Sequence, residues 1–418
     1  MTEMGSDEGR RAPPLGILGL AGLFLFLLVI GYLLKGFLLV ADPERNATFI
    51  QFRLYRFGVF TGLLAAIGLS SAVMAFVLPM WRKPRRVSRT RVGSSVVVWS
   101  GLAIAFASFG LLVVSSGISP TSLRPFNADT RNALLNQYLG RGYIGLAISM
   151  SPLFLLLLPK SVERPWARRL AIFLVLLMFA LLGSRLYMLG TFFSLALFQI
   201  RSSGRIWSVG RQTLLVIAVG VGGAGLGALL FSGETSVHGP YDLVVRGMAT
   251  FDMADTLAVV ENSPVRYSGL SVVEDTFVTY VPRSVWTTKP VFYGAYRLQE
   301  VAFPGIGNEF QLRAFFPVGF LGEAWLNFGL LGVMLLPFLT MRALRWLDEW
   351  ATDSSSNLAF LCFVGGQLLG LLRSPGQFIP YAAMAFIIYR LSTRSVSTAG
   401  QRASLVMSGA AIDAVAVR

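Results

Sequence analysis

The amino-acid sequence predicts an all-α polytopic membrane protein with about ten transmembrane helices and one large structured loop on the external side. Two observations carry this prediction. Of the 418 residues, 54% are hydrophobic and only 14% are charged, and apolar runs of about 20 residues recur along the chain. Charge is too scarce to cover the surface of a water-soluble domain of this size, so we expect the chain to lie in a lipid bilayer.

The apolar runs give the positions of the expected helices. Four runs are of clear spanning length, at residues 15–34, 57–80, 96–116 and 143–159. Six later runs complete the count, at residues 170–182, 186–200, 213–231, 317–339, 358–372 and 378–391. The first run resembles a signal peptide, but it is longer than the apolar part of one and no clean cleavage site follows it. We therefore expect it to stay as a span.

Residues 170–200 form either one over-long helix or two short helices around Gly183-Ser184-Arg185. Basic residues flank this stretch on both sides, namely Lys160, Arg164, Arg168, Arg169, Arg201, Arg205 and Arg211. Positive charge concentrates in cytoplasmic loops, so both flanks belong on the cytoplasmic side. A hairpin of two helices allows this and a single crossing does not, which puts Arg185 at the external face.

The same rule orients the rest of the chain. The basic tract at residues 82–91 becomes cytoplasmic, and both chain ends fall on that side. We divide the chain into four parts: helices 1–7 in residues 1–231, the external loop in residues 232–316, helices 8–10 in residues 317–392, and a cytoplasmic tail in residues 393–418. We expect the tail to be disordered.

The composition also excludes several kinds of partner. The net charge of +15 comes from short basic tracts beside apolar runs, where topology and anionic lipid headgroups explain it, so we expect no nucleic-acid partner. Cys362 is the single cysteine, which rules out a disulfide and a cysteine metal site. No Asp-x-Asp, His-rich, Walker or dinucleotide motif stands out, so we expect neither a metal nor a cofactor.

The external loop is too long for a simple connection, and it has helical apolar periodicity at residues 241–262 and 269–281. In the second stretch the apolar positions are Leu270, Val273, Phe277 and Tyr280. Both stretches predict amphipathic helices that lie on the surface of the bundle. Such helices either form a functional cap or merely cover the bundle.

An irregular segment follows the second predicted helix, because Pro282 stops the helical pattern. Here two cations, Arg283 and Lys289, flank Trp286. A guanidinium group forms two parallel hydrogen bonds to phosphate oxygens, and an indole ring stacks on the flat face of a sugar. This segment therefore suits a substrate that carries phosphate and sugar groups. The alternative is that Trp286 and Lys289 anchor the loop at the membrane interface.

Three stretches resemble the bacterial oligosaccharide repeat-unit polymerases, the O-antigen polymerase family, and more distantly the O-antigen ligases. They are Gly183-Ser184-Arg185, Pro282-Arg283 through Lys289-Pro290, and Gly322-Glu323 through Gly332. The Arg-x10-Gly spacing of the family is matched by Arg131 to Gly142 and by Arg283 to Gly294. The resemblance implies a GT-C-like fold in the bacterial inner membrane.

The resemblance also implies an activity and partners. A growing glycan would pass from undecaprenyl pyrophosphate to a lipid-linked oligosaccharide acceptor outside the cytoplasm, within a membrane that also holds flippase and chain-length regulator proteins. Such a reaction needs cations for the leaving pyrophosphate, and we expect Arg185, Arg283 and Arg313 to supply them, with Arg131 and Arg373 as secondary members.

The reaction also needs a base at the acceptor hydroxyl. Candidates are His238 and the acidic residues that the orientation places outside, namely Glu274, Asp275, Glu300, Glu309 and Glu323. Glu323 lies within a predicted span, where an ionisable group usually has a purpose, so it is either a base or the structural partner of an arginine. The choice between Glu323 and His238 stays open.

Two other activities fit the same sequence. A flippase or transporter for lipid-linked oligosaccharides would also bind pyrophosphate, but it would carry charges through the depth of the bundle, and Lys35 and Glu323 are nearly the only charges well inside spans. A ligase is disfavoured because the ligases have a His-Asn pair where this chain has Val318 and Gly319.

Overall fold

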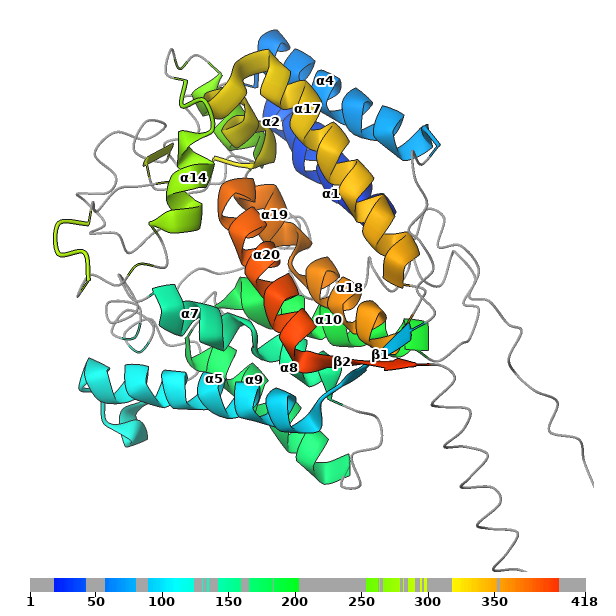
Figure 1. Ribbon diagram of the computed structural model, residues 1–418. Helices are drawn as coiled ribbons and strands as arrows, with labels where there is room; N and C mark the ends of the chain where they lie inside the picture. The colour runs from blue at the N-terminus through cyan, green and yellow to red at the C-terminus, as the bar shows by residue number, and fades with distance from the viewer. Residues whose placement is uncertain are drawn as a thin grey trace, which may run out of the picture.

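The protein is described by a computed structural model. The structure describes residues 19–42, 57–79, 89–123, 142–158, 165–182, 184–202, 253–261, 266–278, 285–289, 318–351 and 354–397, with a few single positions between them. Within these residues the fold is helical apart from one pair of short strands (Figure 1). The predicted span at residues 213–231 lies outside the described residues.

Four helices in the described part of the chain are long and apolar enough to cross a membrane. The first is a continuous helix, Leu20–Ala41, made of α1 (Leu20–Leu28), the π-helical turn η2 (Val29–Leu34) and α2 (Lys35–Ala41). The others are α4 (Val59–Val77), α5 (Ser95–Ser116) and α17 (Phe320–Trp350). These candidate spans support a helical membrane protein, whereas the count of ten spans stays a prediction.

Several predicted spans are shorter or broken helices in the structure. The run at residues 143–159 divides into α7 (Gly142–Ser149) and α8 (Ser151–Leu157). The run at residues 358–372 divides into α18 (Ser355–Gly366) and α19 (Leu368–Arg373), and α20 (Pro375–Ser392) follows. Pro375 starts α20 because a proline at the first helical position gives up an N–H that has no partner within the helix.

The ambiguous stretch at residues 170–200 forms two helices, α9 (Pro165–Leu181) and α10 (Arg185–Ser202). The backbone N–H of Ser184 donates to the carbonyl oxygen of Phe179 at 3.0 Å, which closes α9. The ring of Phe179 stacks on the ring of Tyr187 across the break. The two-helix alternative, which the basic flanks favour, is therefore confirmed.

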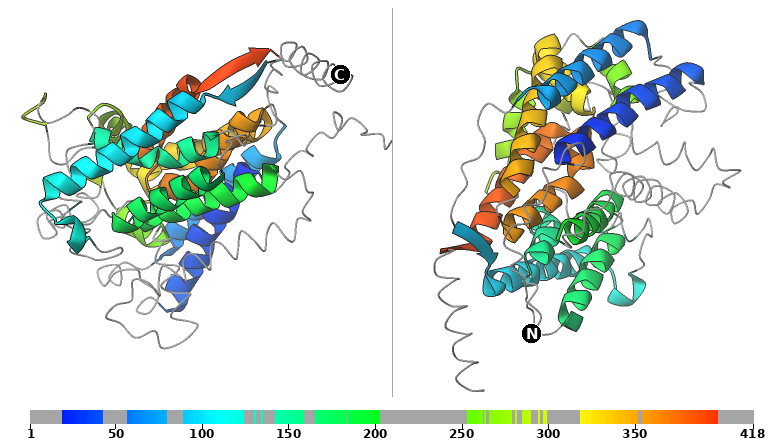
Figure 2. Two further views of the ribbon diagram at one scale, coloured as in Figure 1. Left: turned by 90° about the horizontal axis from the view of Figure 1, so that it is seen from below. Right: turned by 90° about the vertical axis from the view of Figure 1, so that its right-hand side faces the viewer.

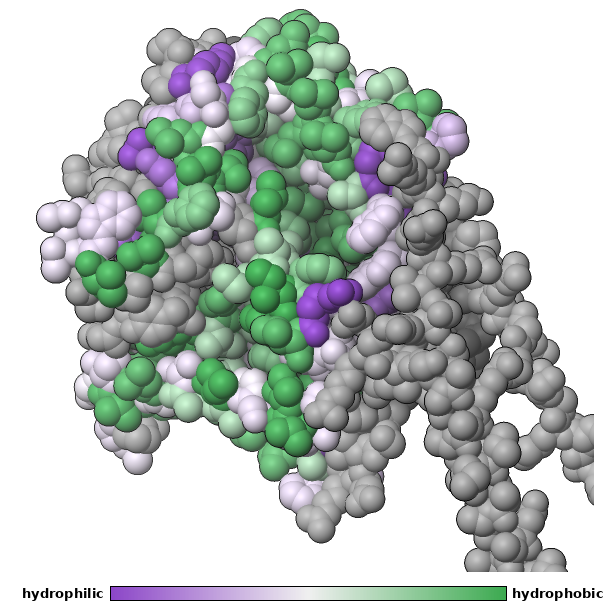
Figure 3. Space-filling model, viewed as in Figure 1, coloured by the Kyte–Doolittle hydropathy of each residue, from purple (hydrophilic) through white to green (hydrophobic). Residues whose placement is uncertain are grey.

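The described helices form two groups, which meet near the two ends of α17. In one group α17 packs along α4 and α1, and in the other α10 packs against α18 while α5 packs against α7 and α8 (Figures 1 and 2). The C-terminal end of α17 reaches the second group through Trp350, whose ring lies 5.7 Å from that of Tyr389 and 6.0 Å from that of Phe360. The surface seen in Figure 3 is mostly hydrophobic, and it is hollowed between α17 and α20.

The two strands join segments that are far apart in the sequence. Strand β1 (Arg89–Gly93) pairs antiparallel with β2 (Thr393–Ser397), with Arg91 opposite Ser395. The tail was expected to be disordered, but its first five residues form a strand, because their backbone pairs with that of β1. Both strands come from segments that the basic tracts assign to the cytoplasm, so their pairing agrees with that orientation.

The external loop contributes two described helices. Helix α13 (Met253–Val260) is not a surface-lying amphipathic helix, because all eight of its residues are buried among α17, α4, α2 and η2. Helix α14 (Leu270–Phe277) lies against α20, with its polar residues Ser271 and Asp275 buried. The predicted second helix thus exists, but its buried face is the polar one.

Candidate functional site

The predicted site residues differ in how far the structure describes them. The side chains of Glu323, Arg373, Trp286 and Lys289 are described. Arg185 begins α10, and its side chain is outside the described part of the structure. His238, Arg131, Arg283 and Arg313 lie outside the described residues. The cationic pocket of Arg185, Arg283 and Arg313 therefore stays a prediction.

Glu323 lies in the first turn of α17, and its buried carboxylate points at the start of α20. The backbone N–H of Gly376 donates to Oε1 at 2.7 Å, and the Ser374 hydroxyl donates to Oε2 at 3.3 Å. The first backbone N–H groups of a helix have no partner within the helix and carry partial positive charge, so they stabilise an anion. Glu323 therefore binds a helix N-terminus, a partner that the sequence did not indicate.

Asp275 of α14 adjoins the same point, with only 2% of the residue exposed. A β-carbon added at Gly376 would clash with Glu323 Oε1 and would lie 3.3 Å from Asp275 Oδ2. The carboxylates of Glu323 and Asp275 therefore both lie next to the α-carbon of Gly376, where any side chain would collide with Glu323. Asp275 was among the acidic candidates, but no spacing in the sequence brings it to Glu323.

Gly294 closes the site on the other side of Asp275. Its φ of +55° is in the left-handed region that favours glycine, and a β-carbon there would clash with Asp275 Oδ1. Its backbone N–H donates to Glu274 Oε2 at 2.7 Å, and Glu274 forms an ion pair with Arg297 at 2.7 Å. The glycine that ends the Arg283-x10-Gly294 spacing thus has a structural role beside a carboxylate.

Further polar contacts fix the three helices around the carboxylates. Asn327 Nδ2 donates to the carbonyl oxygen of Glu323 at 2.9 Å, and the Ser271 hydroxyl donates to Asn327 Oδ1 at 2.9 Å. The backbone N–H of Gly319 donates to the carbonyl oxygen of Arg373 at 3.1 Å. Arg373, a predicted site residue, therefore stands at the junction of α17 and α20, one residue before Ser374.

Trp286 and Lys289 lie in a turn that is hydrogen-bonded to Val281, just beyond the end of α14. The buried Lys289 ammonium donates to the carbonyl oxygen of Val281 at 3.0 Å, and Trp286 Nε1 donates to the Thr288 hydroxyl at 3.1 Å. The Trp286 ring is exposed whereas the Lys289 side chain is buried. The two residues therefore do not act together as an exposed pair.

A second buried polar group lies on the other side of the start of α17. Lys35 Nζ is 3.6 Å from Asp255 Oδ2, and both side chains are buried. Nearby, the backbone N–H of Leu321 donates to the Tyr32 hydroxyl at 2.7 Å. The pair explains how Lys35, a charge inside the helix Leu20–Ala41, is accommodated, because a buried charge needs a partner.

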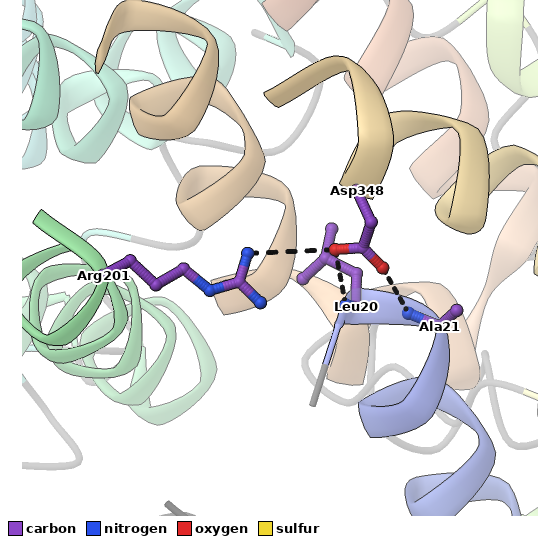
Figure 4. A network of polar contacts seen from close by, with 4 residues as sticks. All are labelled: Leu20, Ala21, Arg201 and Asp348. Carbon is purple, nitrogen blue, oxygen red and sulfur yellow. Dashed lines mark hydrogen bonds and ion pairs between the residues drawn. The ribbon is translucent and has the colours of Figure 1, made fainter. Parts of the chain in front are cut away.

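The opposite end of the bundle has its own buried charge. Asp348 of α17 accepts hydrogen bonds from the backbone N–H groups of Leu20 at 2.9 Å and Ala21 at 3.2 Å, and Arg201 lies 3.8 Å away (Figure 4). A carboxylate from one helix thus caps the start of another.

The comparisons with known proteins add no relative. No protein-family model, no curated protein and no solved structure matches the chain. In the described part of the chain, no group of three or more His, Cys, Asp and Glu side chains could hold a metal ion. The fold and the apolar helices define a membrane protein.

Proposed function

We propose that the protein is a polysaccharide repeat-unit polymerase of the external membrane face. It transfers a growing glycan from undecaprenyl pyrophosphate to a sugar hydroxyl of a lipid-linked oligosaccharide acceptor. The observation that carries the proposal is the meeting of Asp275 and Glu323 at the N-terminus of α20, beside Arg373. The positive-inside pattern assigns this end of the bundle to the outside.

The reaction needs little beyond acid–base and charge stabilisation. The bond between the anomeric carbon and the pyrophosphate oxygen breaks, the acceptor hydroxyl oxygen bonds to that carbon, and the hydroxyl proton passes to a base. The pyrophosphate leaves as an anion, which nearby cations stabilise. A glycosyl pyrophosphate already carries a good leaving group, so the reaction requires no nucleotide.

We assign different roles to the two carboxylates. Both oxygens of Glu323 accept hydrogen bonds from α20, so Glu323 is a positioning residue that holds the turn of Arg373 and Ser374. Asp275, on the neighbouring helix, is the base for the acceptor hydroxyl. Arg373, together with the predicted Arg185, Arg283 and Arg313, binds the pyrophosphate.

Deletion of the gene in the bacterium that carries it tests the proposal. A polymerase mutant makes surface glycan with a single repeat unit, and the ladder of longer products disappears on a gel. Complete polymer that stays on its lipid carrier would indicate a ligase instead. Accumulation of the lipid-linked repeat unit on the cytoplasmic side would indicate a flippase, and either result would overturn the proposal.

A further inference from the structure

Helix α14 exposes its apolar side and buries its polar side. Leu270, Val273 and Phe277 are 44%, 52% and 68% exposed, whereas Ser271 and Asp275 are 0% and 2% exposed. The spacing of three and four residues puts the exposed three on one stripe of the helix. A segment in water would orient these side chains the other way, because exposing three large apolar side chains to water is unfavourable.

The apolar stripe of α14 continues onto a helix that crosses the membrane. A β-carbon added at Gly269, the residue before α14, would lie 2.8 Å from the ring of Phe328 in α17. Phe328 is 51% exposed, and Leu331, just beyond the kink of α17 at Gly329, is 61% exposed. The start of this stripe, at Leu270, therefore adjoins exposed apolar side chains of α17, and Figure 3 shows hydrophobic side chains over α14.

The turn after α14 also exposes apolar side chains. Val285 is 77% exposed and the Trp286 ring is also exposed, while Lys289 fixes this turn to Val281 beyond the end of α14. Tryptophan is enriched where the apolar core of a bilayer meets its headgroups. Eight residues of helix extend only about 12 Å, far less than the roughly 30 Å of a bilayer core, so α14 cannot cross it.

From these contacts we infer that α14 is embedded in the outer boundary of the bilayer, with Leu270, Val273 and Phe277 among the lipid acyl chains. The helix is thus part of the membrane domain, although it comes from a loop. Its opposite face carries Asp275, so the carboxylates of Asp275 and Glu323 lie at the level of the lipid headgroups, not above them in water. The inference is independent of the proposed activity.

Spin labelling tests this inference on the full-length protein. Cys362 is the single cysteine and is buried, so a Cys362→Ala background lets a nitroxide be attached at one chosen position. The test positions are Leu270→Cys, Val273→Cys and Phe277→Cys. Leu331→Cys on α17 is the lipid-exposed control, and Thr121→Cys, an exposed residue of the short helix η4 (Pro120–Ser122), is the water-exposed control.

Collision of the label with oxygen, which partitions into the bilayer, is compared with collision with a water-soluble nickel chelate in liposomes. The expected ratio of oxygen to nickel collisions at the three α14 positions is severalfold higher than at Thr121 and approaches that at Leu331. A ratio equal to that at Thr121 would overturn the inference. Low collision with both reagents would also overturn the inference, because it would mean that protein covers this face of α14. Dipolar broadening that disappears on dilution with unlabelled protein would then show that the covering protein is a second copy of this chain.

Discussion

The backbone N–H of Gly376 donates a hydrogen bond to Glu323 Oε1, so the first turn of α20 is joined to the first turn of α17. This bond connects the two groups of helices at the end of the bundle where the external loop packs. It also sets the position of Arg373, whose carbonyl oxygen accepts the N–H of Gly319. The geometry of the candidate site therefore depends on a contact between two helix starts.

Replacing Gly376 by alanine tests this contact. A methyl group at this position clashes with the Glu323 carboxylate, so Gly376→Ala should lower the free energy of unfolding by about 1–3 kcal/mol through the lost hydrogen bond. Gly110→Ala in α5 is the matched control, because its methyl group meets no atom within 4 Å. It should be neutral or stabilising by up to about 1 kcal/mol. Equal unfolding temperatures for both variants in detergent would refute the close contact.

The buried pair of Lys35 and Asp255 should behave as a structural unit. Lys35→Ala leaves a buried carboxylate without its cation, and we expect a loss of about 3–5 kcal/mol in stability. The double variant Lys35→Met with Asp255→Leu removes both charges and should recover most of that loss, since apolar replacement of a buried pair is often neutral. Unfolding by denaturant measures the free energy of unfolding of the unmodified protein, of Lys35→Ala and of the double variant. A double variant as unstable as the single one would contradict this account.

Asp348 should hold the start of the first span. Asp348→Asn removes the charge that faces Arg201 and weakens the acceptor for the N–H groups of Leu20 and Ala21, so we expect a loss of about 1–3 kcal/mol. The same change in an Arg201→Ala background should cost less, because the ion pair is already absent. Additive losses in this double-mutant cycle would mean that Asp348 and Arg201 do not interact.

The pairing of β1 with β2 is open to cross-linking. Arg91 lies opposite Ser395, so cysteines at these two positions in a Cys362→Ala background should form a disulfide under mild oxidation. A cysteine at Ser397 is a diagonal neighbour of Arg91 at about 7–8 Å and should react more slowly. Cross-linking at equal rates, or none at either position, would be incompatible with the register of the strands.

The sequence predicts the helices of this fold better than it predicts their contacts. Apolar runs located Val59–Val77 and Ser95–Ser116 within a few residues, because a span needs a minimum apolar length. Basic flanks indicated that α9 and α10 are two helices and not one, because positive charge follows topology. Both signals are local, so both can be found in one sequence.

The candidate site shows what local signals miss. Glu323 was found because a carboxylate within a span is rare, but Ser374 and Gly376, its partners, lie about fifty residues away and have no distinctive type. Asp275 and Ser271 are four residues apart, so they share one face of α14, and the sequence already shows this polar face. The prediction placed the apolar stripe of this helix against the bundle, whereas in the structure that stripe is the exposed one.

The roles of the two carboxylates are tested most directly by chain extension with the purified protein in proteoliposomes. The substrate is an oligosaccharide on polyprenyl pyrophosphate, and gel electrophoresis counts the repeat units in the product. Asp275→Asn should lower the extension rate about a hundredfold or more, as for a lost general base. Glu323→Gln should lose less, because an amide oxygen still accepts the Gly376 N–H, and Glu349→Gln, at the other end of α17, should extend at the rate of the unmodified protein. Full activity of Asp275→Asn, or no extension by the unmodified protein, would contradict the account.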